Sequence, residues 1–271
     1  MINSVLVTGA YGDSIELMLW DESNGYIVEE IEGLGPVDAN IVSTNYASFD
    51  GSQFQSARRS PRNIIFKIGF ATKHPTFSAE ELRRRLSNIF RTKSQVSMLF
   101  RSDKNYLING YVETNEPSIF SKDPKADISI MCLDPDFLSE NPIIGQMDWA
   151  STVYDSFINY QGTEPTGMEF SLKISNLTGA NITVSKQHTY LGKQSMSFIG
   201  FPYTVLGFFT TNTNIGRRAV YYSGDSVLYA LQTGSQWIQL YPGMNNFAVN
   251  GTFTGSAVVL NYSYNERYGS I

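Results

Sequence analysis

Few side chains in this sequence could carry acid–base, nucleophilic or metal chemistry. The 271 residues include two histidines, His74 and His188, and one cysteine, Cys132. A single cysteine excludes a disulfide within the chain and a metal cluster built from thiolates. The sequence also lacks a Gly-x-Ser-x-Gly elbow, a phosphate-binding loop and a His-Glu-x-x-His motif. The sequence therefore contains none of these catalytic motifs.

Paired carboxylates are the remaining catalytic candidates. They are Asp13 with Glu16, Glu29 with Glu30, and Asp134 with Asp136. A glycosidase needs two carboxyl groups that face each other across a cleft, and adjacency in sequence does not supply that geometry. We interpret these pairs as solvated side chains, and we expect no enzymatic activity, no cofactor and no metal.

The composition divides the chain into two parts. Residues 1–149 carry 14 basic and 20 acidic side chains, net −6, whereas residues 150–271 carry 6 and 5, net +1. The second part holds 20 of the 36 aromatic residues. Prolines at 135 and 142 interrupt every regular pattern between the two parts. We therefore predict two domains, 1–140 and 141–271.

Alternating apolar residues predict strands in the first domain. In residues 63–70, Ile64, Phe66 and Ile68 fall on one face, and in residues 126–132 the same alternation turns Cys132 inward. One helix is predicted to begin after Ser78, because Ser78 and Glu81 have the spacing of a capping box. An apolar stripe follows at Leu82, Leu86, Ile89 and Phe90.

A long polar stretch from Tyr46 to Pro61 breaks the strand pattern, and we predict a loop there. Arg58, Arg59 and Arg62 lie at its exit, within an otherwise acidic half of the chain. We interpret these arginines as a contact to an acidic neighbouring subunit. A flexible surface loop is the alternative.

The second domain is predicted to be an antiparallel sandwich. Short alternating segments recur between Gly, Asn, Pro and Thr turns, for example at 168–174, 227–231 and 258–264, and no helical period separates them. Among its aromatic residues, some could stack on sugar rings. These candidates are Tyr203, Tyr221, Tyr222 and Trp237. Their alternative role is to fill the core or an interface.

Two strings near the end of the sequence are distinctive: Leu240–Phe247 contains an L-x-P-G-x-N-x turn, and Tyr262–Gly269 ends in aromatic-x-Glu-Arg-Tyr-Gly. Both strings resemble segments of the distal tail protein (Dit) family of long-tailed, non-contractile bacteriophages. Further upstream, Asn159–Thr163, Leu133–Phe137 and Arg59–Phe66 also resemble family segments.

The resemblance implies a mainly β protein: an N-terminal β-sandwich with one helix, and a C-terminal galectin-like or carbohydrate-module-like sandwich of jelly-roll type. It implies a virion structural protein of the tail tip, assembled in the host cytoplasm, that forms a homohexameric ring. The implied partners are the tail tube protein and the tail-associated hub protein, with a receptor-binding or tape-measure protein as a further candidate. DNA would pass through the ring without specific binding.

Composition agrees with these expectations. A net charge of −5 and a pI of about 5.1 provide no basic footprint for nucleic acid. No run of eighteen apolar residues occurs, so we expect no membrane insertion. The alternative function is a carbohydrate-binding or receptor-binding module that attaches to the host surface.

Overall fold

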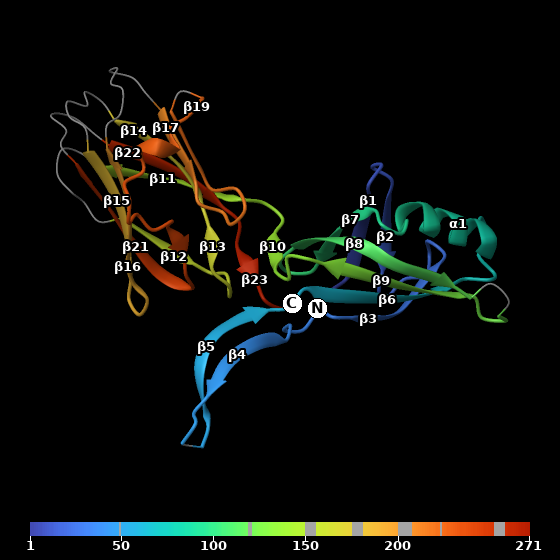
Figure 1. Ribbon diagram of the computed structural model, residues 1–271. Helices are drawn as coiled ribbons and strands as arrows, with labels where there is room; N and C mark the ends of the chain where they lie inside the picture. Colours follow the sequence, from blue (N-terminus) through green and yellow to red (C-terminus); the bar gives the residue numbers. More distant parts are fainter. Residues whose placement is uncertain are drawn as a thin grey trace. The chain divides into compact units, whose positions relative to one another are not determined.

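The computed structural model describes residues 1–48, 50–118, 121–149, 156–174, 181–199, 208–222, 224–251 and 258–271. The chain forms two compact units (Figure 1). Unit 1 comprises Met1–Glu140 and Tyr268–Ile271, and unit 2 comprises Asn141–Arg267. The last four residues thus belong to unit 1, whereas the predicted domain 141–271 contained them. Among the described residues, no helix is long and apolar enough to span a membrane.

Unit 1 is built on a nine-stranded antiparallel sheet in the order β2-β1-β7-β8-β9-β6-β3, with β10 paired to β8 and β23 paired to β10. The strands are β1 (Ser4–Gly9), β2 (Ser14–Met18), β3 (Tyr26–Glu32), β6 (Arg62–Phe70), β7 (Gln95–Arg101), β8 (Tyr106–Pro117), β9 (Lys125–Cys132), β10 (Phe137–Ser139) and β23 (Arg267–Tyr268). The alternation predicted for residues 63–70 is confirmed, since Ile64, Phe66 and Ile68 are fully buried.

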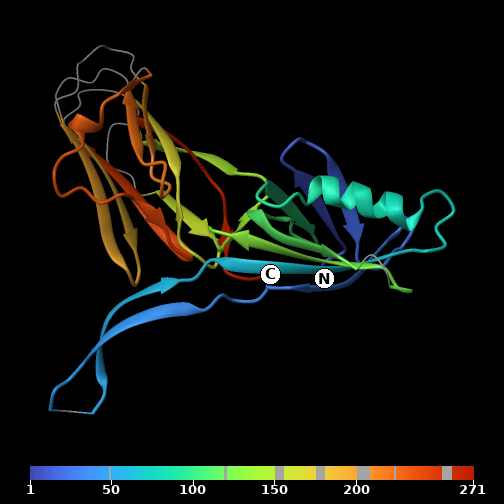
Figure 2. The same ribbon diagram turned by 45° about the vertical axis from the view of Figure 1, so that its right-hand side comes forward.

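One helix, α1 (Ala79–Ile89), lies over one face of this sheet (Figures 1 and 2). Its predicted start is confirmed: the Ser78 hydroxyl accepts a hydrogen bond from the Glu81 backbone N–H at 3.2 Å. Leu82, Leu86 and Ile89 are buried against the sheet. The core of unit 1 therefore lies between the helix and the sheet, and the opposite sheet face carries the polar side chains.

A separate two-stranded ribbon, β4 (Ala39–Asn45) and β5 (Ser52–Arg59), corrects the predicted loop. All of β4 and all of β5 except Arg59 are exposed. The loop prediction was wrong because a ribbon with two exposed faces has no core side and so needs no apolar alternation. Figures 1 and 2 show this hairpin extending away from the sheet of unit 1.

Unit 2 is a β-sandwich. A six-stranded sheet in the order β11-β22-β14-β17-β18-β19 faces a four-stranded sheet in the order β12-β21-β15-β16, and β13 pairs with β20. The strands are β11 (Ile143–Trp149), β12 (Ser156–Tyr160), β13 (Thr166–Gly167), β14 (Glu169–Ile174), β15 (Asn181–His188), β16 (Gly192–Ile199), β17 (Phe208–Asn212), β18 (Ala219–Tyr222), β19 (Asp225–Ser226), β20 (Gln239–Leu240), β21 (Gly243–Gly251) and β22 (Val258–Tyr264).

Apolar side chains from both sheets, such as Leu172 and Leu260 from one and Val184 and Phe247 from the other, form its core. One predicted strand, residues 227–231, is instead a 3-10 turn, η1 (Leu228–Ala230). Val227 and Ala230 are buried there, a spacing of three that suits a helical turn rather than a strand.

Candidate functional site

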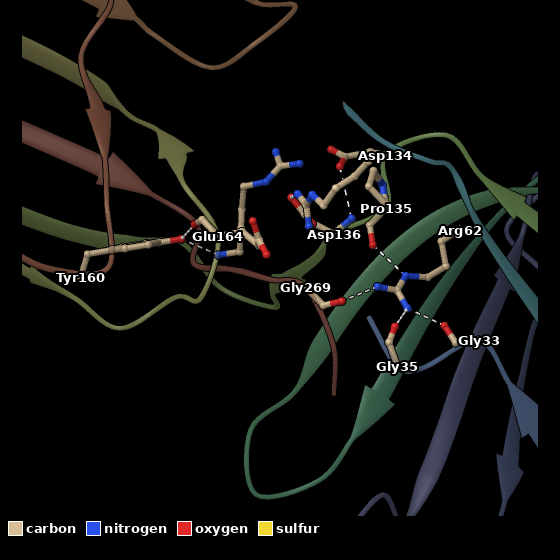
Figure 3. Close-up of polar contacts among 11 residues, drawn as sticks. Gly33, Gly35, Arg62, Asp134, Pro135, Asp136, Tyr160, Glu164 and Gly269 are labelled. Carbon is tan, nitrogen blue, oxygen red and sulfur yellow. Dashed lines mark hydrogen bonds and ion pairs between the residues drawn. The ribbon is translucent and has the colours of Figure 1, made fainter. Parts of the chain in front are cut away.

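Arg62 is the centre of a buried polar cluster in unit 1. It is only 1% exposed, and its guanidinium donates hydrogen bonds to four backbone carbonyls. The acceptors are the carbonyls of Gly33, Gly35, Pro135 and Gly269 (Figure 3), and the distance to the Pro135 oxygen is 2.7 Å. The guanidinium also lies 4.5 Å above the Phe137 ring centre. Burial lowers the pKa of Arg62, but arginine stays protonated in proteins.

Arg62 therefore joins three segments that are far apart in the sequence: the stretch before β4, the stretch before β10, and the C-terminal residues. Glycine is required at position 33 for the backbone there to lie close to Asn63, because its φ is +86° and a Cβ would lie 2.0 Å from the Asn63 carbonyl oxygen. Of the three arginines predicted to contact a neighbouring subunit, Arg62 is thus buried and hydrogen-bonded within unit 1.

Arg59, at the end of β5, fixes the base of the hairpin to the same region. Two of its guanidinium nitrogens contact the two carboxylate oxygens of Asp136, at 2.8 and 2.6 Å. The Asp136 side chain is 2% exposed and that of Arg59 is 33% exposed, so the ion pair is well shielded from water on one side. Arg58, one residue earlier, is exposed.

Beyond this base, the hairpin presents apolar side chains to solvent. Ile41 is 63% exposed, Val42 51% and Phe54 63%. Isolated two-stranded ribbons are marginally stable in water. The hairpin thus combines a fixed base with an apolar surface that nothing within unit 1 buries.

The sheet face opposite α1 is acidic. One cross-strand row runs Glu30, Lys67, Asp127, Glu116 over β3, β6, β9 and β8. The Lys67 ammonium is already bonded to Glu30 at 2.7 Å and to Glu32, and Lys125 pairs with Glu29 at 2.7 Å. The two carboxylates at the other end of the row, Asp127 and Glu116, keep this face negative.

The strings that carried the family resemblance have structural roles. In unit 2 the Tyr160 hydroxyl donates to the Glu164 carbonyl at 2.7 Å and accepts from the Arg267 backbone N–H at 2.8 Å (Figure 3). Asn245 is fully buried, and its amide donates to the carbonyls of Tyr241 and Gly243 at 2.7 and 2.9 Å. These bonds hold the turn at Pro242, where Gly243 has a φ of +95°.

Neither histidine presents a free ring. His74 Nε2 contacts the Ser23 carbonyl at 2.9 Å, and its Nδ1 accepts from the Thr76 and Phe77 backbone N–H groups. His188 Nε2 contacts the Pro242 carbonyl at 3.0 Å. Cys132 is fully buried as predicted, and burial raises the pKa of its thiol to about 12. Within the described ranges, no group of three or more His, Cys, Asp or Glu could hold a metal.

The four sugar-stacking candidates do not form one cluster. Tyr203 lies outside the described residues. Tyr222 and Trp237 are half-buried and pack against the core of unit 2. Tyr221 points to the other side of β18 from Tyr222 and is 43% exposed. It is the most exposed of the described candidates.

Comparison with known proteins gives matches in structure alone. No protein-family model matches this sequence, and no curated protein sequence is significantly similar to it. The crystal structure of the Dit protein of phage SPP1, described as part of a hub adsorption apparatus, aligns over 97% of this chain and 98% of its own, with a TM-score of 0.67 and 14% identity. A chain of the phage P2 baseplate aligns over 100% of both chains, with a TM-score of 0.48 and 9% identity.

The resemblance found in the sequence is thereby confirmed in the fold: along nearly its whole length, this chain has the architecture of the SPP1 Dit protein.

Proposed function

We propose that this chain is a structural protein of a phage tail tip that assembles, without catalysing a reaction, into a homohexameric ring between the tail tube protein and the tail-associated hub protein. The observation that carries the proposal is the β4–β5 hairpin, whose base is fixed and whose length is exposed. The fold shared with the SPP1 Dit protein over 97% of the chain supports it.

The hairpin favours assembly through two different surfaces. An exposed ribbon with Ile41, Val42 and Phe54 on it is stabilised when a neighbouring subunit buries those side chains. A projecting element that docks elsewhere on an identical subunit makes a head-to-tail interface, and such interfaces close into rings. Arg58 would add charge complementarity to an acidic neighbour.

Removing the apolar surface of the hairpin tests this assembly. We expect the double variant Ile41→Ser with Phe54→Ser to lose rings in light scattering and negative-stain images, because the docking contact loses its apolar area. The matched control is Tyr190→Ser with Leu191→Ser, at an exposed turn of unit 2 where these side chains are 88% and 59% exposed. Rings that persist in the hairpin variant would refute this role, as would a chain that stays monomeric even with the tail tube protein present.

We further propose that the acidic sheet face lines the channel of the ring. Lys and Arg contacts to phosphates hold DNA, whereas Asp127 and Glu116 repel it. Rings that carry Glu116→Lys and Asp127→Lys should retain linear duplex DNA at low salt and release it as salt rises. Control rings with Asp13→Lys and Asp103→Lys, at exposed turns, have the same total charge. Equal DNA retention by both variants would contradict this assignment.

A further inference from the structure

The outer face of the six-stranded sheet in unit 2 carries an uncharged polar row that includes one exposed aromatic ring. Strand register places six residues directly opposite one another on β11, β22, β14, β17, β18 and β19. In that order they are Gln146, Asn261, Ser171, Thr210, Tyr221 and Ser226. Residues paired in this way lie on the same face of a sheet.

Burial of the alternate residues shows that this face points outward. On β14 and β22, Leu172 and Leu260 are almost fully buried, and on β17 Thr211 is fully buried. Their neighbours in the row therefore point away from the core. Tyr221, next to last in the row, is 43% exposed, and Gln146, at the opposite end, is also exposed.

The chemistry of the row selects a class of ligand. Amides and hydroxyls both donate and accept hydrogen bonds, and an exposed ring offers an apolar, electron-rich face. The row has no Lys or Arg to hold phosphates and no carboxylate to bind a cation.

The spacing of the row matches a linear chain of sugars. Adjacent strands lie ~4.8 Å apart, so a polar side chain recurs about once per pyranose unit along the row. Among the residues that the structure describes, no side-chain hydrogen bond involves Asn261, Ser171 or Thr210. The nearest charged side chains on β14, Glu169 and Lys173, lie two residues to either side and have opposite signs.

We infer that this row binds a neutral linear glycan across the strands, with Tyr221 stacking on one sugar ring and Thr210, Ser171 and Asn261 bonding the hydroxyls of the sugars that follow it. This site goes beyond the proposed ring and does not depend on it. Among the described sugar-stacking candidates from the sequence, the inferred site gives a ligand contact to Tyr221 alone.

The test uses the full chain and an array of neutral linear oligosaccharides of three to six hexoses, with α and β linkages. We expect the wild type to bind at least one of them. In titrations with that oligosaccharide, Tyr221→Ala should weaken binding about tenfold, Asn261→Ala should weaken it a few-fold, and Tyr221→Phe should retain it because the ring remains.

Phe157→Ala is the matched control, since Phe157 is a 61% exposed ring on the outer face of the four-stranded sheet. We expect this variant to bind as tightly as the wild type. The inference is overturned if no oligosaccharide binds the wild type, or if Phe157→Ala loses as much affinity as Tyr221→Ala.

Light scattering on the same samples separates this inference from the ring. A chain that forms rings but binds no oligosaccharide keeps the proposed function and loses the glycan site. A chain that binds an oligosaccharide through Tyr221 but never forms rings keeps the site and loses the proposed function.

Discussion

Among the described residues, each unit buries one lysine or arginine side chain, and the two are stabilised very differently. Arg62 in unit 1 is 1% exposed and donates to four carbonyls. Lys186 in unit 2 is fully buried, its ammonium has no hydrogen-bond partner among the described residues, and it lies 4.2 Å from the centre of the Tyr241 ring. A buried charge with full hydrogen bonding connects segments of the fold, whereas one without it lowers stability.

The same replacement at both positions should give opposite results, and the larger effect is expected at Arg62. Arg62→Met leaves four buried carbonyls without their donor, so we expect unit 1 to lose about 3–5 kcal/mol. Hydrogen exchange of amides in β6, followed by mass spectrometry, measures this loss locally. Arg62→Lys is the control for charge alone. It should retain only a minor part of the stability lost in Arg62→Met, because one ammonium cannot reach all four carbonyls.

Lys186→Met should stabilise unit 2. Burial lowers the pKa of Lys186 from its ordinary value to about 8, and each pKa unit corresponds to ~1.4 kcal/mol. We therefore expect a gain of about 3–4 kcal/mol at pH 7, measured by hydrogen exchange of amides in β15. A loss of stability would mean that the ammonium contributes favourably, and the contrast with Arg62 would disappear.

The gain from Lys186→Met should also depend on pH. Because the pKa of Lys186 is lower in the folded chain than in the unfolded one, the unfolded chain binds more protons between pH 8 and about 10.5. The cost of burying the charge is complete below pH 8 and disappears as pH rises through this window. The difference in stability between Lys186→Met and the wild type should thus shrink from pH 7 to pH 10, and a constant difference would exclude the charge as its cause.

Both buried cations occupy positions that alternate in step with the buried apolar residues of their strands. This spacing is the sequence signal that indicates their burial. Arg62 precedes Ile64 and Phe66 on the buried face of β6, and Lys186 follows Val184 on that of β15. Their environments could not be predicted. The acceptors of Arg62 are backbone carbonyls as far away as Gly269, and every residue carries such a group, so no side-chain pattern marks them.

The same reasoning explains which elements the sequence predicted. Helix α1 begins at a local cap between Ser78 and Glu81, and β6 buries alternate residues, so short windows of sequence suffice. The β4–β5 hairpin has no buried face within unit 1. If the hairpin docks on another subunit, the pattern of its side chains depends on the surface of that subunit. The polar row that includes Tyr221 depends on the register of six strands, which only the folded sheet supplies.

The smallest expected effect concerns the Tyr241 ring, which lies beside the Lys186 ammonium. Cation–π contacts at desolvated sites contribute about 1–2 kcal/mol, so Tyr241→Leu should destabilise unit 2 by about this amount in the wild type and by less in the Lys186→Met background. A double-mutant cycle isolates the coupling, for which we expect about 1 kcal/mol at pH 7. At pH 10, where most of the lysine is neutral, the coupling should approach zero. Equal coupling at both pH values would show that Tyr241 packs against the lysine stem and does not stabilise its charge, and Lys186 would then be a wholly uncompensated charge.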